Sequence, residues 1–343
     1  MTSFLKSDRA RPVAIWLTVV AILVFAMVVV GGATRLTGSG LSITEWKPIS
    51  GVVPPLDHEA WMAEFRNYQR IPQYRFINRG MSLEAFQSIY WWEWAHRLLG
   101  RLLGVVFAVP FVFFLATRQL PGRLIWRCLV LFLLGGLQGL VGWWMVSSGL
   151  ETRVYVAPER LAAHLGLALL LYCALIWTAW EAWEGQGRPT RPSVWKPVSA
   201  GFLALAFFQC LLGALVAGNK AGLIDNDWPL MGGRLFPQGY ALHGLWRTLA
   251  HSQPATQFNH RMVAYLVVIA GLAIAGAAAP ARHLPERIRY LAGAIGLLVL
   301  AQAGLGISTL MRGVPLGLAI AHQLGAALLL AIAVSFAWRA RRI

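Results

Sequence analysis

Four histidines are the residues of this sequence with the clearest capacity for chemistry. Of the eight histidines, His96, His164, His260 and His322 are the ones that lie inside long apolar segments. Each lies one to two helical turns from the same end of its segment, roughly 5–10 Å at 1.5 Å per residue. Ionisable groups inside a membrane are costly and usually functional. Two neutral imidazoles on facing helices can bind one haem iron from opposite sides of the porphyrin plane.

A single helix histidine is just as readily a packing residue or an interhelical hydrogen-bond donor. That explanation weakens here because the four histidines form two pairs that match between the halves of the chain. Zinc and copper sites usually need further Cys, His or carboxylate ligands, and no cluster of cysteines or carboxylates lies near these pairs in the sequence. The histidines therefore predict two haem sites, one formed by His96 and His164 and the other by His260 and His322.

The two predicted sites differ in one polar neighbour of their first histidine and share an arginine that follows it. Glu93 precedes the first histidine by three residues and shares its helical face, whereas Gln257 takes that place before the third histidine. A carboxylate beside a haem can accept protons, stabilise a cationic intermediate or orient water, and an ion pair with Arg97 is the alternative role. Arg97 and Arg261 each follow a histidine and either bind haem propionates or extend toward the interface. The asymmetry predicts one active site and one helper site.

The elements that must position these residues are apolar runs of about twenty residues, each long enough to cross a hydrocarbon core of roughly 30 Å as a helix. Hydrophobic residues make up 57% of the 343 residues and charged residues 13%, which argues against a soluble domain. Continuous apolar runs predict helices rather than the alternating strands of a barrel. We expect an all-α integral membrane protein with eight transmembrane helices, at 13–34, 93–116, 126–148, 159–181, 195–217, 257–279, 290–311 and 317–338.

The two halves of the chain resemble each other. Segment 31–46 aligns with segment 213–228, and the first two histidines align with the last two. Every change of spacing falls in a loop, and the first outer loop is longer than its counterpart. Four helices therefore look duplicated in parallel orientation, which predicts two four-helix bundles. We expect residues 1–183 to form the repeat that holds the substrate and residues 184–343 to form the repeat that holds the cofactor.

Basic residues predict that both termini are cytoplasmic. The two short loops on the opposite side carry only Arg153 and Arg312, whereas five segments on the side of the termini carry three basic residues each. In a bacterium, the chain is then expected to cross the inner membrane several times, with the long loops 35–92 and 218–256 in the periplasm. The fifteen residues are Lys6, Arg9, Arg11, Arg118, Arg123, Arg127, Arg188, Arg191, Lys196, Arg282, Arg287, Arg289, Arg339, Arg341 and Arg342.

Two other classes of site are excluded by composition and spacing. The net charge of +16 is explained by topology, and no basic stripe interleaved with aromatic residues suggests a nucleic-acid partner. Cys128, Cys173 and Cys210 are isolated within apolar runs, so they predict neither a disulfide framework nor a zinc site.

The motifs around these residues resemble those of the haem A synthase family, in the long form of alphaproteobacteria and mitochondria. The resemblance covers nearly the whole chain, and it implies oxidation of the C8 methyl of haem O to a formyl by two successive hydroxylations. The product, haem A, is the cofactor of aa3-type cytochrome oxidases. The motifs are GGATRLTGSGLSITEWKPISGVVPPL at 31–56, EFRNYQRIPQY at 64–74, EWAHRLLGR at 93–101, GALVAGNKAGLIDNDWPLMGGRLFP at 213–237, FNHRMVAY at 258–265 and AHQLGAALLL at 321–330.

The resemblance also implies roles for individual residues and partners. Substrate haem O would lie between His96 and His164, with Glu93 as the catalytic glutamate, and a haem b cofactor would lie between His260 and His322. Haem O synthase is the expected substrate donor, while the electron donor and a homo-oligomeric state are left open. Other branches of the family carry a cysteine pair in the outer loops, which this sequence lacks. The longer first loop, with aromatic residues between positions 57 and 74, is instead expected to cover the tail of the substrate.

Two other functions explain part of the pattern. A two-haem cytochrome b that only passes electrons accounts for the histidine pairs, but not for a carboxylate that accompanies one pair alone. A transporter built from parallel repeats predicts broken helices and a polar midplane. The polar groups of this chain cluster near the outer surface instead.

Overall fold

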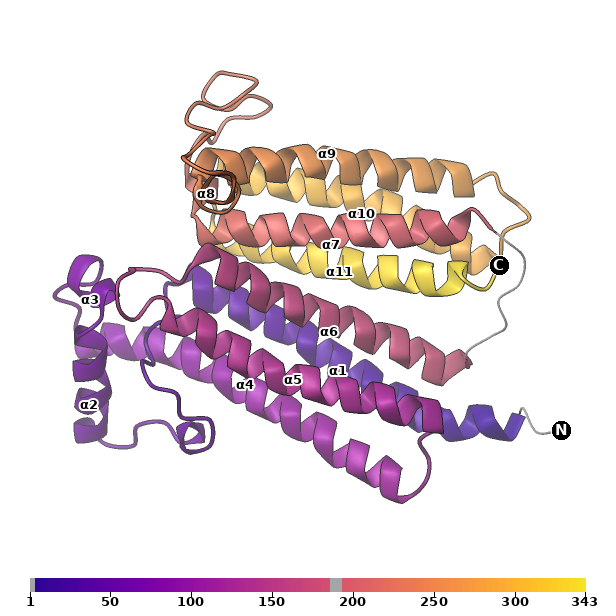
Figure 1. The fold of residues 1–343 in the computed structure, drawn as a ribbon, viewed down its shortest axis with the longest axis horizontal. Helices are drawn as coiled ribbons and strands as arrows, with labels where there is room; N and C mark the ends of the chain where they lie inside the picture. Colours follow the sequence, from indigo (N-terminus) through magenta and orange to yellow (C-terminus); the bar gives the residue numbers. More distant parts are fainter. Residues whose placement is uncertain (1–3, 186–192) are drawn as a thin grey trace.

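The computed structural model describes residues 4–185 and 193–343, with the side chains of residues 4–10 left out of the description. Within this part of the chain, eight helices are long and apolar enough to cross a membrane, and they run side by side in Figure 1. The prediction of an all-α, multi-pass membrane protein is therefore confirmed. The eight helices are α1 Phe4–Leu36, α4 Leu83–Ala116, α5 Gly122–Ser147, α6 Pro158–Glu184, α7 Trp195–Gly218, α9 Gln253–Ala278, α10 Glu286–Met311 and α11 Leu316–Ala340.

Helix α4 extends well beyond the predicted span, which began at residue 93. Ser82 caps its first turn by accepting the N–H of Ala85 at 3.2 Å, and Glu84 lies in that turn, where a negative charge complements the helix dipole. The ten additional residues add about 15 Å to the helix. The added turns lie outside the predicted apolar span, next to the long segments that connect the helices. Hydropathy therefore did not indicate that the helix begins this early.

The eight helices form two groups of four. Helices α1, α4, α5 and α6 pack around one apolar core, and α7, α9, α10 and α11 pack around a second one. The groups meet where α1 and α6 contact α7 and α11, around a small shared cluster of Val28, Leu169, Ala206 and Leu330. Figure 1 shows the two groups side by side, with the N-terminal group in indigo and magenta. This arrangement is consistent with two four-helix bundles, while the assignment of substrate and cofactor to 1–183 and 184–343 stays a prediction.

Both termini lie at the same end of the molecule, opposite the long outer segments (Figure 1). At that end, two buried or half-buried carboxylates bind several of the basic residues that suggested the topology. Glu181 pairs with Arg123 and Arg127. Glu184 pairs with Arg287, Arg339 and Arg342. Arg188, Arg191 and the side chains of Lys6 and Arg9 lie outside the described residues.

The long outer segments, predicted as loops, contain short helices. The first segment forms η1 (Ser50–Val52), α2 (His58–Gln69) and α3 (Pro72–Phe76), and the second forms η2 (Ala221–Leu223) and α8 (Leu245–His251). The aromatic residues of α2 do not point into open space. Trp61, Phe65 and Tyr68 are buried against Phe86 and Tyr90 of α4. They form the core that holds the first segment on α4, and its covering of a substrate tail stays a prediction.

Candidate functional site

Each of the four histidines packs against a glycine on a neighbouring helix. The contacts join α1 to α4, α5 to α6, α7 to α9 and α10 to α11, so the same arrangement occurs four times. A Cβ atom on these glycines would lie 2.8–3.2 Å from the Cε1 atom of the facing imidazole, closer than carbon atoms normally approach. The glycines therefore let the rings lie directly on the neighbouring backbone. The pairs are Gly31 with His96, Gly142 with His164, Gly213 with His260 and Gly306 with His322.

The rings of the second pair of histidines lie close to each other. The ring centroids of His260 and His322 are 6.4 Å apart, and the ring planes are at 89° to each other. Two imidazoles that each place a nitrogen about 2 Å from one metal have centroids roughly 6 Å apart, because that bond length is typical of histidine coordination. In the described part of the chain, the imidazole rings of His260 and His322 contact each other, whereas no such contact joins the rings of His96 and His164.

The donor set fits haem iron better than a metal ion held by protein ligands alone. No group of three or more His, Cys, Asp and Glu side chains converges within residues 4–185 and 193–343, whereas zinc sites use three or four protein ligands. A haem supplies four nitrogens of its own and needs two axial ligands. The Nδ1 atoms of His96 and His322 are buried without a hydrogen-bond partner. Such atoms are expensive in a folded protein unless a ligand or a partner satisfies them.

Two histidines are also held by a glutamine from the neighbouring helix. The Nε2 atom of Gln138 donates to the backbone carbonyl of His164 at 2.9 Å and lies 3.2 Å from its ring Nδ1. The Nε2 atom of Gln209 donates to the carbonyl of His260 at 3.0 Å and lies 3.0 Å from its Nδ1. Each amide therefore bridges a ring and the backbone that carries it, and this restricts rotation of the ring.

Glu93 is buried three residues before the first histidine, and both of its oxygen atoms accept hydrogen bonds. Oε2 accepts a hydrogen bond from the Ser42 hydroxyl at 2.7 Å and from the Ile43 N–H at 2.9 Å. Oε1 accepts from Nε and NH2 of Arg97 at 3.1 and 2.7 Å. The carboxylate therefore joins α4 to the first outer segment at the level of His96, and the ion pair considered for Arg97 is formed.

Gln257 occupies the corresponding place before His260 with opposite hydrogen-bond polarity. Its Nε2 atom donates to the backbone carbonyls of Ala221 and Ile224 at 2.7 and 2.6 Å. Its Oε1 atom accepts from Arg261 at 2.9 Å. The neutral amide of Gln257 thus holds the second outer segment by donating hydrogen bonds to its carbonyl oxygens. The carboxylate of Glu93 holds the first outer segment by accepting hydrogen bonds from its N–H and O–H groups.

The two arginines that follow the histidines both hold an outer segment. Arg97 donates to the carbonyls of Glu45 and Ile43 at 2.9 and 2.7 Å. Arg261 donates to the carbonyls of Leu230 and Asp225, both at 2.8 Å, and its Nε atom is buried without a partner. Most of their donors are therefore used within the protein, and a role in binding propionates stays a prediction.

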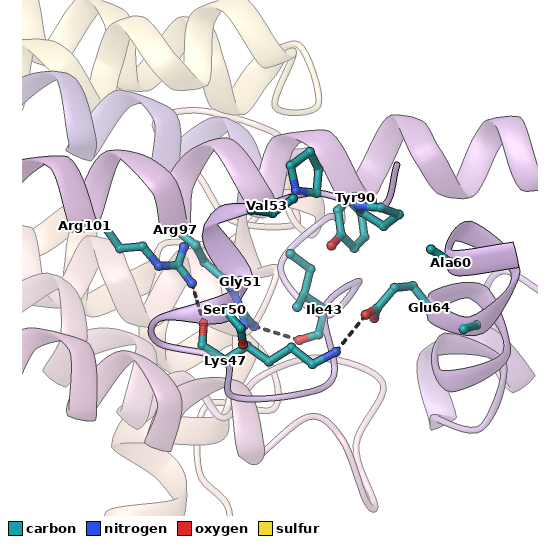
Figure 2. A pocket seen from close by; sticks show the side chains of 13 residues that line it. Ile43, Lys47, Ser50, Gly51, Val53, Ala60, Glu64, Tyr90, Arg97 and Arg101 are labelled. Atoms are coloured by element: carbon teal, nitrogen blue, oxygen red, sulfur yellow. Dashed lines mark hydrogen bonds and ion pairs between the residues drawn. The ribbon is translucent and has the colours of Figure 1, made fainter. Parts of the chain in front are cut away.

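A cavity of ≈ 340 Å³ lies beside Arg97 on the outer side of the first site. Figure 2 shows its position between the first outer segment, α2 and α4, with Lys47 reaching Glu64 at 3.0 Å and Arg101 reaching the carbonyl of Lys47 at 2.7 Å. The hydrogen bond from Lys47 to Glu45 raises the pKa of the Lys47 ammonium group. The charged residues that line the cavity are thus Lys47, Arg97, Arg101 and Glu64, and Arg97 among them also contacts Glu93.

A small acidic turn marks the second outer segment. Asp227 accepts hydrogen bonds from the N–H groups of Gly232 and Gly233 at 2.8 and 2.9 Å. These bonds stabilise the ionised form and lower the pKa of Asp227 below its usual value. Gly232 and Gly233 both have positive φ, 59° and 74°, which explains why glycine occupies both positions.

A sequence model of the cytochrome oxidase assembly protein family, COX15-CtaA, matches residues 14–334. The chain belongs to this family. It is 64% identical to the Heme A synthase of Caulobacter sp. (strain K31) and 59% identical to that of Caulobacter vibrioides, in both cases over 100% of this chain and of the relative. It is 49% identical to the Heme A synthase of Parvibaculum lavamentivorans, over 98% of this chain and 96% of the relative. The resemblance inferred from the motifs is confirmed.

Several positioning residues of this COX15-CtaA family member were missed by sequence reasoning. Ser42 was part of a recognised motif, but nothing in its type or spacing indicated that it would contact Glu93. Gln209 and the four glycines gave a detectable signal, because three of the helices that face a histidine carry glutamine four residues before the contacting glycine. This spacing of glutamine and glycine becomes visible when the four helices that face a histidine are compared with one another, rather than one half of the chain with the other.

Proposed function

We propose that this chain is a membrane oxidoreductase that oxidises haem O to haem A. The observation that carries the proposal is a buried carboxylate, Glu93, within one turn of one histidine pair and replaced by an amide at the other pair. It occurs in a chain 64% identical over its full length to a protein named Heme A synthase. A duplicated scaffold with one charged copy supports one reactive site and one site for electron transfer.

The substrate site in this proposal lies between α4 and α6. His96 and His164 would bind the iron of haem O, and the C8 methyl would lie on the side of Glu93. Each hydroxylation would replace a C–H bond of this carbon by a C–OH bond with dioxygen as the oxidant: one oxygen atom enters the substrate, and the other leaves as water, taking up two electrons and two protons delivered to the site. The second hydroxylation gives a geminal diol that loses water to leave the formyl group.

The protein's own contribution at this site is to hold and orient polar groups. Glu93 is fixed by four hydrogen bonds, so its position relative to His96 is well defined. We infer that it orients water or takes up a proton during the oxidation, a role that a positioned carboxylate can perform. Arg97 bonds to Glu93 and also lines the cavity of Figure 2, so its fixed positive charge stabilises the ionised carboxylate from the side of that cavity.

The second site would bind haem b between His260 and His322. That haem, when bound, would pass electrons to the substrate site. The described residues fit such a cofactor because the ring centroids of His260 and His322 are 6.4 Å apart, close to the separation expected for two ligands of one iron, and Gln209 restrains His260. Gln257 and Arg261 hold the second outer segment over this end of the bundle, and the free Nε of Arg261 is suited to a propionate.

The remaining assignments follow from this function. Substrate would come from haem O synthase, and electrons would come from a donor in the lipid bilayer or at its surface. We place the chain in the bacterial inner membrane with both termini cytoplasmic, as the distribution of basic residues indicates. The N-terminal repeat, 1–183, would act on haem O, and the C-terminal repeat, 184–343, would hold haem b.

The principal alternative is a two-haem cytochrome b that transfers electrons without modifying haem. The experiment that separates the two functions is HPLC of haems extracted from the chain expressed together with a source of haem O. We expect haem b together with haem O and haem A. A preparation that contains haem b alone, after expression with haem O, would support the electron carrier and contradict the proposal.

A further inference from the structure

The four helices that contact a histidine share a local pattern, and helix α1 departs from it at one residue. On each helix that contacts a histidine, the residue one turn before the contacting glycine points toward the same neighbouring helix. Met27 takes this place before Gly31, the glycine that contacts His96. The other three positions are occupied by Gln138, Gln209 and Gln302.

The glutamines lie against the backbone that carries the facing histidine. Gln138 and Gln209 bond to the carbonyl of the histidine itself and approach its Nδ1 atom. The amide of Gln302 lies against Gly325, within one turn of His322. All three amides can therefore restrain a histidine or the turn that carries it.

Met27 occupies the equivalent volume without an amide. Its methyl group is 3.4 Å from the position of a Cβ atom on Gly100, one turn after His96. A thioether is at most a weak acceptor and donates no hydrogen bond. The Nδ1 atom of His96 is buried without a partner. His322 also has an unpartnered Nδ1, but there an amide lies within one turn, whereas Met27 supplies none to His96.

We propose that Met27 makes His96 the weakly held ligand of the first site, so that haem enters and leaves by exchange at His96 while His164 stays in place. This inference rests on the proposed function, because a substrate site must release its haem after each turnover and a cofactor site must retain it. Residues that orient a metal ligand from behind typically change metal affinity by about 10–100-fold. A methionine in place of the glutamine found at the other three positions is therefore a simple way to make His96 exchangeable.

The test compares haem release from the two sites of the full-length chain in lipid nanodiscs, loaded with haem O and haem b. Excess apomyoglobin serves as the haem acceptor, and HPLC of the remaining haems reports each site separately. For Met27→Gln we expect haem O release about tenfold slower than in the parent chain, with haem b release unchanged. The low-spin EPR signal of the first site should narrow as its ligand becomes ordered.

Two further variants provide controls. Met27→Leu, which matches methionine in size and lacks an amide, is expected to release haem O at the parent rate. Gln209→Met should give the second site the character of the first and accelerate haem b release about tenfold. This variant keeps the inference testable if Met27→Gln fails to fold.

The outcomes distinguish failure of this inference from failure of the proposed function. Equal haem O release from Met27→Gln and Met27→Leu, or unchanged haem b release from Gln209→Met, overturns the inference and leaves the enzyme proposal standing. A parent chain that binds haem b but neither haem O nor haem A overturns both.

Discussion

The two histidine pairs occupy equivalent places in the two helix groups, yet their surroundings differ in charge and in rigidity. The second pair presents two rings 6.4 Å apart and is bordered by a neutral amide, Gln257. The first pair is bordered by a buried carboxylate, Glu93, and has a methionine where the other positions have glutamine. Identical backbone positions thus carry different chemistry. The difference indicates that few side-chain changes are enough to give the two copies of a duplicated scaffold different charge.

The outer segments repeat this contrast. Both are held to a helix by an arginine that binds two of their carbonyl groups. The first segment additionally gives an N–H and an O–H to a carboxylate, which forms stronger hydrogen bonds than a neutral acceptor does. Under the proposed function, a firmer cover and a weakly held His96 would together suit reaction at the first site followed by release of the product.

The largest effect is expected from removing a ligand of the second pair. His260→Ala or His322→Ala should eliminate most of the bound haem b and abolish haem A formation, because electrons no longer reach the first site. Haem content per polypeptide and extracted haem A measure the two effects. His243→Ala, which changes an exposed histidine of the second outer segment, is the matched control. Retention of haem b in both ligand variants would break the assignment of the second site.

The next effect tests the charge difference between the sites. Glu93→Gln should keep haem bound but slow oxidation about 10²–10⁴-fold, the usual contribution of a positioned acid or base. The new amide must also place a donor against Ser42, Ile43 or Arg97, all of which are donors in the parent chain. HPLC of extracted haems is the measurement, and Glu64→Gln is the control. A haem A yield near that of the parent would refute a catalytic role for Glu93.

Glycine contacts allow the two sites to be compared at equal chemical change. Gly142→Ala and Gly306→Ala each place a methyl group about 3 Å from a histidine ring. Such overpacking typically costs about 1–3 kcal/mol, and we expect a reduced low-spin haem signal at the affected site. Gly139→Ala and Gly304→Ala, on the same helices, meet nothing within 4 Å and should behave like the parent. A low-spin signal equally intense in all four variants would contradict close packing of the rings.

A smaller effect should separate the two arginines. Arg97→Lys replaces two hydrogen bonds to a carboxylate, whereas Arg261→Lys replaces one to a neutral amide. Hydrogen bonds to charged groups contribute about 1.5–3 kcal/mol and neutral ones about 0.5–1.5 kcal/mol. Hydrogen exchange of the Ile43 amide should therefore accelerate strongly in Arg97→Lys. Exchange of the amides of the second outer segment should accelerate less in Arg261→Lys. The reverse order would show that the carboxylate does not hold the first segment more firmly.

The smallest effect concerns pH. The pKa of Asp227 is lowered in the folded chain, so its contribution to the second outer segment is complete above the unfolded value, about 3.9. The contribution is lost as the pH falls from there through the lower folded value. Hydrogen exchange at Gly232 and Gly233, corrected for its intrinsic pH dependence, should show this loss. Asp227→Asn should remove the pH dependence, and its persistence in that variant would assign the effect to another group.

Much of the architecture could be predicted from the sequence because lipid imposes few solutions. An apolar run of about twenty residues must form a helix, so the eight spans and the depth of the four histidines follow from hydropathy. The duplication was visible because the same residue types recur at corresponding positions in both halves. Membership of the family followed from motifs that extend over nearly the whole chain.

Other features depended on contacts between residues distant in sequence. The aromatic residues of α2 looked suited to a substrate tail, but the structure packs Trp61, Phe65 and Tyr68 onto α4. Arg97 and Arg261 bind carbonyls of the outer segments, some 30 to 55 residues away in the sequence, while their binding of propionates stays a prediction. No local pattern encodes such partners, because they are chosen by how the segments fold back over the helix ends.

The sequence by itself determined the eight helices, the two histidine pairs and the single carboxylate that distinguishes them, since hydrophobic length and residue type are local properties. The tertiary structure decided which groups those residues touch. It brought the ring centroids of His260 and His322 to 6.4 Å from each other, engaged both oxygens of Glu93 and placed Met27 where the other positions have an amide. These features depend on rotation and spacing of packed helices, and small-residue contacts such as that of Gly31 with His96 set both.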